Sequence, residues 1–169
     1  MAMLVEVTVF YLEMRSPPQR IVEPPRDGLV VLHVESPSAP YYRFLYAGVG
    51  KDYHWQGRKK LPDDELATIL GDPADEVYVL HVAGSPAGFS ELDRRKQGDI
   101  ELVQFGLMPE FTGQGLGKWF LHWTLEKAWS YQPGRLWLHT CTLDHPAAVP
   151  LYKGTAFEQF REESTRREL

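Results

Sequence analysis

The sequence has one cysteine, no long apolar run and a shortage of positive charge, and each of these excludes a class of protein. Because Cys141 is the only cysteine in 169 residues, no internal disulfide can form, which fits a reducing compartment. No apolar stretch approaches the length of a membrane-spanning helix, and the N-terminus lacks a basic region followed by an apolar core. The net charge of −5 argues against a broad contact with nucleic acid. We therefore expect a cytoplasmic protein whose partners include neither nucleic acid nor a membrane.

The length and composition are typical of one folded domain. Hydrophobic residues make up 43% of the chain and charged residues 24%, which is enough apolar material to build a core without disulfides or metals. We expect residues 1–169 to form a single domain. The oligomeric state stays open, and a homodimer is one of the states that the sequence allows.

The order of the expected elements predicts an α/β fold. Apolar periodicity, turn residues and helix-start signals divide the chain into strands and helices. The expected strands are 5–14, 29–35, 77–82, 88–93, 99–107, 136–142 and 157–161, and the expected helices are 41–46, 62–70, 116–130 and 146–153. The proline-rich stretch 15–28 predicts a loop. Strands interleaved with helices, with a run of hairpins in the middle, favour a mixed sheet in a layered fold.

A glycine-rich turn follows the strand 99–107. Gly113, Gly115 and Gly117 alternate with other residues where the helix 116–130 begins. A turn with so few Cβ atoms lets its backbone approach a ligand, and the N–H groups at a helix N-terminus attract anions. The spacing matches neither the nucleotide P-loop nor the dinucleotide motif G-x-G-x-x-G. An anion site and an ordinary strand-turn-helix junction are the two interpretations left by this stretch alone.

The residues around this turn resemble the phosphate-binding motif of the GNAT superfamily of N-acetyltransferases, usually written Arg/Gln-x-x-Gly-x-Gly/Ala after a strand that ends in apolar-x-Pro. The likeness is carried by FGLMP at 105–109 and TGQGLG at 112–117, with Thr112 at the position of the usual Arg or Gln. The resemblance implies that the amides from Gly113 to Gly117 hold the pyrophosphate of acetyl-CoA, and that the backbone of Leu107 pairs with the pantetheine arm. The residues it implies for binding acetyl-CoA are Phe105, Leu107, Thr112, Gly113, Gln114, Gly115, Leu116, Gly117, Lys118 and His145.

A second motif of the same superfamily lies further along the chain. The family carries an Asn here, then an Ala, a Tyr near the end of a helix, and Gly-Phe. In this sequence His145 takes the Asn position, Ala148 the Ala, Tyr152 the Tyr, and Ala156-Phe157 stands for Gly-Phe. The two motifs occur in the expected order, so the chain is identified as a member of the GNAT superfamily.

The resemblance implies a GNAT-like fold, a mixed and mostly antiparallel central sheet flanked by helices. The family normally ends with one further strand, whereas 162–169 is charged throughout. We therefore expect the last strand to be missing, or to be replaced by the N-terminal pair of strands.

Acetyl transfer to an amine needs a base, because a lysine-type amine with a pKa of about 10.4 is almost wholly protonated at neutral pH. Glu101 lies six residues before Leu107, where histone-acetylating members of the superfamily carry their base, and even spacing places both residues on one side of an ideal strand. Glu91, on the preceding strand, is the competing candidate. The resemblance assigns the hydroxyl of Tyr152 to the coenzyme sulfur as general acid. Backbone N–H groups near Leu107 would meet the oxyanion.

Other interpretations of the chain stay open. His139, Cys141, Asp144 and His145 are four possible metal ligands, but they lack the paired spacing typical of zinc, and Cys-His proximity in sequence is weak evidence for a nucleophilic pair. We expect no metal. A non-catalytic acyl-CoA-binding sensor would keep the glycine turn, and a partner-binding domain would use the aromatic residues in 41–55 on its surface.

The main prediction is an acyltransferase, an acetyl-CoA-dependent N-acetyltransferase. It would transfer the acetyl group directly to a primary amine, without a covalent intermediate. Small amines, amino acids, peptide N-termini and lysine side chains all qualify as acceptors. The aromatic residues in 41–55 give a weak hint of an apolar or aromatic acceptor.

Overall fold

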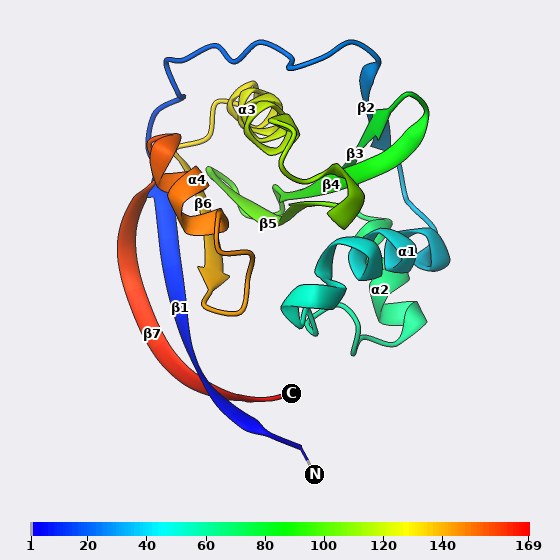
Figure 1. Cartoon of the computed structure of the whole chain (residues 1–169), viewed down its shortest axis with the longest axis vertical. Coiled ribbons are helices and arrows are strands. Elements are labelled where there is room, and N and C mark those ends of the chain that lie inside the picture. Colours follow the sequence, from blue (N-terminus) through cyan, green and yellow to red (C-terminus); the bar gives the residue numbers. More distant parts are fainter. Residues whose placement is uncertain (1) are drawn as a thin grey trace.

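The computed structural model describes residues 2–169 and is built on a seven-stranded sheet with the order β2-β3-β4-β5-β6-β1-β7 (Figure 1). In chain order the elements are β1 (Leu4–Met14), β2 (Leu29–Val34), α1 (Ala39–Gly50), η1 (Lys51–Tyr53), α2 (Asp63–Leu70), β3 (Asp75–Val82), β4 (Ser85–Asp93), β5 (Asp99–Leu107), η2 (Pro109–Phe111), α3 (Leu116–Trp129), β6 (Arg135–Cys141), α4 (Ala148–Gly154) and β7 (Glu158–Glu168). Neighbouring strands run antiparallel except β5 and β6, which are parallel. The predicted fold class is confirmed.

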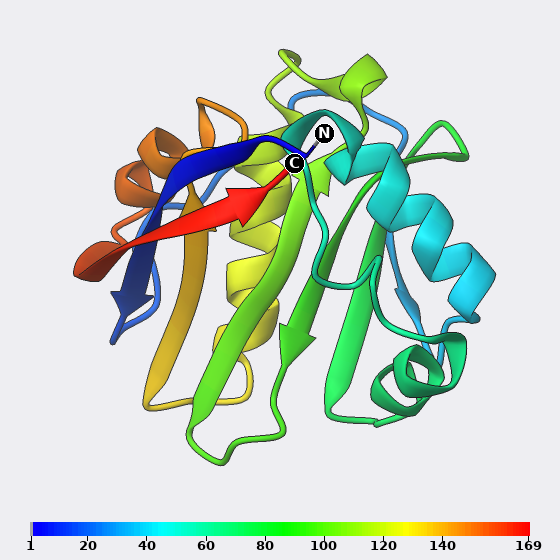
Figure 2. The same ribbon diagram turned by 90° about the horizontal axis from the view of Figure 1, so that it is seen from below.

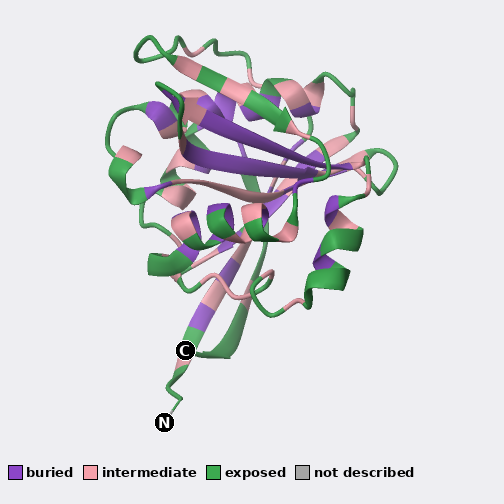
Figure 3. Cartoon of the chain, turned by 90° about the vertical axis from the view of Figure 1, so that its right-hand side faces the viewer, coloured by how far each residue is buried: buried purple, intermediate pink, exposed green. Residues whose placement is uncertain are grey.

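Helices cover both faces of the sheet. Helix α3 packs on one face, where Leu121 and Leu125 join Leu102 and Leu136 in one core cluster. Helices α1 and α2 pack on the other face, in a second cluster around Tyr42. Figure 3 shows the central strands buried, while the outer surfaces of the helices are exposed. Within residues 2–169, none of the helices combines the length and apolarity needed to cross a membrane.

The N-terminal strand completes the sheet in a way that the sequence predicted only in part. Strand β1 lies between β6 and β7 and runs antiparallel to both, while β2, the other member of the expected N-terminal pair, forms the opposite edge. Figure 2 shows β1 and β7 side by side with the two termini close together, and the N–H of Leu169 donates to the carbonyl of Met3 over 3.0 Å. Strand β1 alone, and not β1 together with β2, therefore takes the place of the expected further strand.

Strand β7 is longer than the expected strand 157–161, because it continues through the charged residues to Glu168. It pairs on one side only, with β1, and almost all of its side chains are exposed. Charged residues suit such an edge, since they discourage pairing with another chain. The charge pattern of 162–168 was therefore compatible with a strand.

A β-bulge in β5 changes the direction of its side chains. Glu91 pairs with Gln104 and Leu92 pairs with Leu102, so that one extra residue lies between them in β5. Leu102 packs with α3, which turns its neighbour Glu101 toward the face covered by α1 and α2. Leu107 also packs on the α3 face. The expectation that Glu101 and Leu107 share one side is wrong, because the bulge breaks the alternation.

Candidate functional site

A large cavity follows the gap between β5 and β6. These two strands pair only from Asp99 to Glu101 on β5 and from Arg135 to Trp137 on β6, and then diverge. The cavity has a volume of about 1170 Å³. It reaches from the glycine turn before α3, past the diverging strands, to Glu101 on the α1–α2 face. One continuous space therefore joins the two regions that the sequence singled out.

The glycine turn is open to a ligand. Gly113 and Gly115 have φ angles of +75° and +79°, which favour glycine. A Cβ atom at Gly113 would find no other atom within 4 Å. Helix α3 begins after Gly115 with no side chain capping its first N–H groups. Free N–H groups at the positive end of a helix dipole fit an anion such as the pyrophosphate of acetyl-CoA.

The polar side chains of this turn are engaged in local hydrogen bonds. The Thr112 hydroxyl donates to the carbonyl of Pro109 over 2.9 Å, and the Gln114 amide donates to the carbonyl of Glu110 over 3.2 Å. Leu116 is fully buried in the core. The donors left for a ligand are thus the backbone amides, with the ammonium group of Lys118 beside them in the cavity lining.

The diverging strands supply an apolar channel. Phe105 and Leu107 both line the cavity. The Phe105 ring lies 5.5 Å from the ring of Phe120 and 6.3 Å from that of Tyr152, measured between centroids. Beyond Glu101 the backbone of β5 has no pairing with β6, so its polar groups on that side are free for an extended ligand.

Glu101 lines this cavity, and its side chain is 22% exposed. Burial, reinforced by the negative charge of Asp93, raises its pKa to about 7, while the positive charge of Arg58 acts in the opposite direction. The Nε2 atom of His139 lies 3.7 Å from its Oε1 atom. Burial lowers the pKa of His139, so this contact involves a neutral imidazole at neutral pH. A carboxyl group with a pKa near 7 is suited to accept a proton.

Glu91, the competing candidate, occupies a different environment. Its side chain is fully buried and forms an ion pair of 2.8 Å with Arg58. The hydroxyl of Tyr42 donates to its other oxygen. Glu91 does not line the cavity, whereas Glu101 does. The geometry therefore favours Glu101 over Glu91 as a base that can reach a substrate.

Tyr152 lies on α4 and reaches the cavity from the α3 side of the channel. Its ring packs edge-on against Phe105 and Phe157. Burial, together with the charge of Asp144, raises the pKa of its hydroxyl. The phenol thus keeps its proton at neutral pH and can act as a donor.

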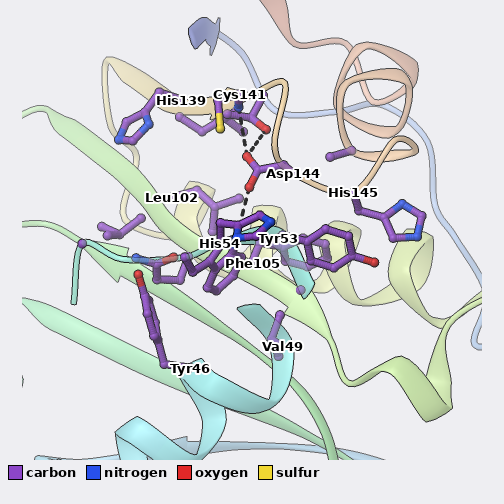
Figure 4. A pocket seen from close by; sticks show the side chains of 18 of the residues that line it. Tyr46, Val49, Tyr53, His54, Leu102, Phe105, His139, Cys141, Asp144 and His145 are labelled. Atoms are coloured by element: carbon purple, nitrogen blue, oxygen red, sulfur yellow. Dashed lines mark hydrogen bonds between the residues drawn. The ribbon is translucent and has the colours of Figure 1, made fainter. Parts of the chain in front are cut away.

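His145 lies at the rim of the cavity, in the segment between β6 and α4. Its Nδ1 atom accepts a hydrogen bond from the N–H of Ala147 over 3.0 Å. The centroid of its ring lies 5.4 Å from that of Tyr53 (Figure 4). All predicted site residues except Gln114 and Leu116 line the same cavity.

Sequence reasoning missed several cavity residues. Arg58 comes from the loop after η1, which carries no recognisable motif. In the sequence, Trp55 is only one of the aromatic residues in 41–55, and His139 and Asp144 are candidates only as metal ligands. Their roles depend on contacts between distant segments, such as the hydrogen bond from Trp55 to Asp144. The sequence signals are the aromatic residues in 41–55, which include Trp55, and the spacing of His139 and Cys141, which places both on one face of a strand.

The four possible metal ligands do not form a metal site. Among residues 2–169, no group of three or more histidine, cysteine, aspartate or glutamate side chains is arranged to hold an ion. The ring of His139 packs against Tyr11, and Asp144 accepts hydrogen bonds from Thr140 and from the N–H of Cys141. The expectation of a reaction without metal remains a prediction.

Comparison with known proteins places the chain in a family. Residues 38–157 match the family model described as "Acetyltransferase (GNAT) family". The chain belongs to this family. No curated protein matches the sequence.

Several solved structures share the GNAT fold with this chain at low sequence identity. A GCN5-related N-acetyltransferase from Kribbella flavida is 17% identical with a TM-score of 0.60, and the match covers 99% of this chain and 59% of that one. Another from Sphaerobacter thermophilus is 14% identical with a TM-score of 0.64, covering 96% and 51%. An aminoglycoside acetyltransferase from an uncultured soil metagenomic sample, in complex with sisomicin, is 12% identical with a TM-score of 0.61, covering 76% and 88%. The chain thus spans only part of the length of the first two proteins.

Proposed function

We propose that this GNAT acetyltransferase moves the acetyl group of acetyl-CoA directly onto the nitrogen of a primary amine. The observation that carries the proposal is the single cavity that joins the open glycine turn, the phenol of Tyr152 and the carboxyl group of Glu101. These are the three kinds of group that such a transfer needs: an anion site, an acid and a base.

Coenzyme binding would use the backbone more than side chains. The free amides at the start of α3 suit the pyrophosphate, and Lys118 adds a positive charge. The gap between β5 and β6, with Phe105 and Leu107 in its walls, suits the pantetheine arm. The acetyl group would then lie where the two strands diverge, close to Glu101.

The reaction would need three proton transfers. Glu101 takes a proton from the acceptor ammonium, which leaves a neutral nitrogen to attack the thioester carbonyl. Unpaired N–H groups of β5 stabilise the oxyanion that forms. When the carbon–sulfur bond breaks, the hydroxyl of Tyr152 supplies the proton that the leaving sulfur requires. The attacking nitrogen releases its second proton, which returns through solvent to the phenolate of Tyr152, so that the nitrogen becomes an amide, CoA leaves as a thiol and Tyr152 is protonated again.

The acceptor side favours a cationic amine. Glu101 and Asp93 line this part of the cavity together with Arg95. Because Arg95 pairs with Asp93 over 2.8 Å, Glu101 is the carboxyl group left to attract a positive charge on the acceptor. The aminoglycoside acetyltransferase in complex with sisomicin shares the fold, so aminoglycosides belong among the acceptors to be tested. No observation specifically favours the acyl-CoA sensor.

A panel of amines tests the proposal. Acetyl-CoA binding is measured by calorimetry, and thiol release is then followed with small amines, amino acids, peptides and aminoglycosides. We expect amine-dependent thiol release and an acetylated product by mass spectrometry. Binding of acetyl-CoA without release for any amine would favour the sensor, and absence of binding would contradict both functions.

A further inference from the structure

Two loops from opposite sides of the gap meet over the cavity. The segment 51–57 follows α1 on the β5 side, and the segment 142–147 follows β6 on the other. The indole Nε1 of Trp55 donates to Oδ1 of Asp144 over 3.1 Å. Beside this bond, the ring centroids of Tyr53 and His145 lie 5.4 Å apart, with the ring planes tilted by 57°. Figure 4 shows Asp144 reaching toward the Tyr53 side of the cavity. The gap is therefore bridged on the α1–α2 face.

Trp55 is anchored firmly on the β5 side. Its ring lies 5.2 Å from the ring of Tyr46 and 6.4 Å from that of Phe89. A Cβ atom at Gly50 would lie 2.5 Å from the indole, and one at Gly106 would lie 3.7 Å from its far edge. The indole thus rests on the C-terminal turn of α1 and on β5, and the glycine at position 50 leaves the room that it needs.

Asp144 is anchored equally firmly on the β6 side. Its Oδ2 atom accepts from the N–H of Cys141 over 2.9 Å and from the hydroxyl of Thr140. Its Oδ1 atom is left to accept from Trp55. A hydrogen bond to an ionised carboxylate is stronger than one between neutral groups. The contact is therefore well suited to hold the two sides together.

The indole and the phenol of Tyr152 lie on opposite sides of the channel. Phe105 and Tyr152 belong to the α3 face, where they pack with the core around α3. Trp55 lies on the other face, beside the cluster around Tyr42. A coenzyme arm placed between β5 and β6 would thus have a wall on each side. Glu101 lies on the same face as the indole, so the acceptor must approach beyond the edge of Trp55.

We propose that Trp55, held by Asp144, is a positioning residue that closes the acceptor-facing side of the channel over the acetyl-bearing arm of the coenzyme. The inference rests on the proposed function, because it requires that the channel binds this arm. The bond between Trp55 and Asp144 must break before the arm can leave sideways. Its strength therefore controls how fast the coenzyme dissociates.

Two substitutions and their combination test this role. Trp55→Phe keeps an aromatic ring and removes the Nε1–H donor, and Asp144→Asn removes the charge of the acceptor. We expect Trp55→Phe to raise the dissociation rate of acetyl-CoA roughly tenfold, as for the loss of a hydrogen bond to a charged group, measured by stopped-flow fluorescence. Asp144→Asn should raise it less, because its amide oxygen can still accept from Trp55. The double variant should dissociate no faster than Trp55→Phe alone, since both changes act on the same bond.

Trp129→Phe is the matched control. The Nε1 atom of Trp129 donates to the sulfur of Met14 over 3.2 Å, away from the cavity, so its loss should leave the dissociation rate unchanged. A merely structural Trp55 would lower the melting temperature and leave the rate unchanged at temperatures well below melting. If wild-type protein binds acetyl-CoA and all variants release it at the same rate, the positioning role is wrong while the proposed function stands. If the wild type binds no acetyl-CoA, the proposed function fails first.

Discussion

Glu101 should reduce the stability of the protein at neutral and alkaline pH, and Glu101→Gln should restore it. Burial and the charge of Asp93 raise the pKa of this carboxyl group from 4.5 to about 7. Because one pKa unit corresponds to about 1.36 kcal/mol, ionised Glu101 costs up to about 3 kcal/mol of folding free energy. Its side chain is only 22% exposed, so solvent screens little of this cost.

The direction of the pH effect follows from the two pKa values. In the unfolded chain Glu101 releases its proton near 4.5, and in the folded protein near 7. Between these pH values only the folded state holds the proton, so the wild type loses stability relative to Glu101→Gln as the pH rises. Below 4.5 the carboxyl group is neutral in both states and the two proteins should be equally stable. Above 7 the variant should be more stable by up to about 3 kcal/mol.

Urea denaturation at a series of pH values between 4 and 8 measures this difference. Glu6→Gln is the control, because Glu6 is an exposed residue of β1 and its loss should change little. A difference between wild type and Glu101→Gln that stays constant with pH would contradict the reasoning. So would a variant that is less stable than the wild type at pH 8, since the carboxylate would then be favourably placed.

The remaining predictions concern catalysis and coenzyme binding. The kcat/KM of the wild type should rise with pH through about 7 as Glu101 ionises, and Glu101→Gln should remove this rise in a pH-rate profile. Tyr152→Phe should slow turnover by roughly 10²- to 10⁴-fold, the usual contribution of a general acid, with calorimetric affinity for acetyl-CoA nearly intact; unaltered turnover, measured where chemistry limits the rate, would leave Tyr152 a packing role. Thr112→Arg should tighten acetyl-CoA binding by about 0.2 to 1 kcal/mol through a solvent-exposed ion pair, a gain that added salt erodes. Gly115→Val should weaken this binding, because φ there is +79°, a conformation that a branched side chain rarely adopts; unchanged affinity in titrations of both variants would show that the turn does not bind the pyrophosphate.

The helices, the strands and the open glycine turn follow from local features of the sequence. A glycine that needs a positive φ, followed by an apolar helix, predicts the turn before α3 without knowledge of any distant residue. Helix α2 is an equally local case, since Pro62 precedes it and Asp63 to Glu65 fill its first turn. Such signals are readable because the residues that decide them are neighbours in the chain. Tyr152, which lines the cavity, was reached differently, through the resemblance of the second motif to the GNAT superfamily.

Only the tertiary structure decided which strand completes the sheet, which glutamate reaches the cavity and which two loops are joined across it. Val9 pairs with Cys141 and with Glu163, partners more than 130 residues away, and no local pattern specifies such a choice. Glu101 and Glu91 are both carboxylates on neighbouring strands, but their surroundings differ. Arg58 forms an ion pair with Glu91, whereas burial raises the pKa of Glu101. The bridge from Trp55 to Asp144 joins two loops whose sequences carry no sign of each other. Contacts of this kind depend on packing between distant segments, which composition and periodicity do not encode.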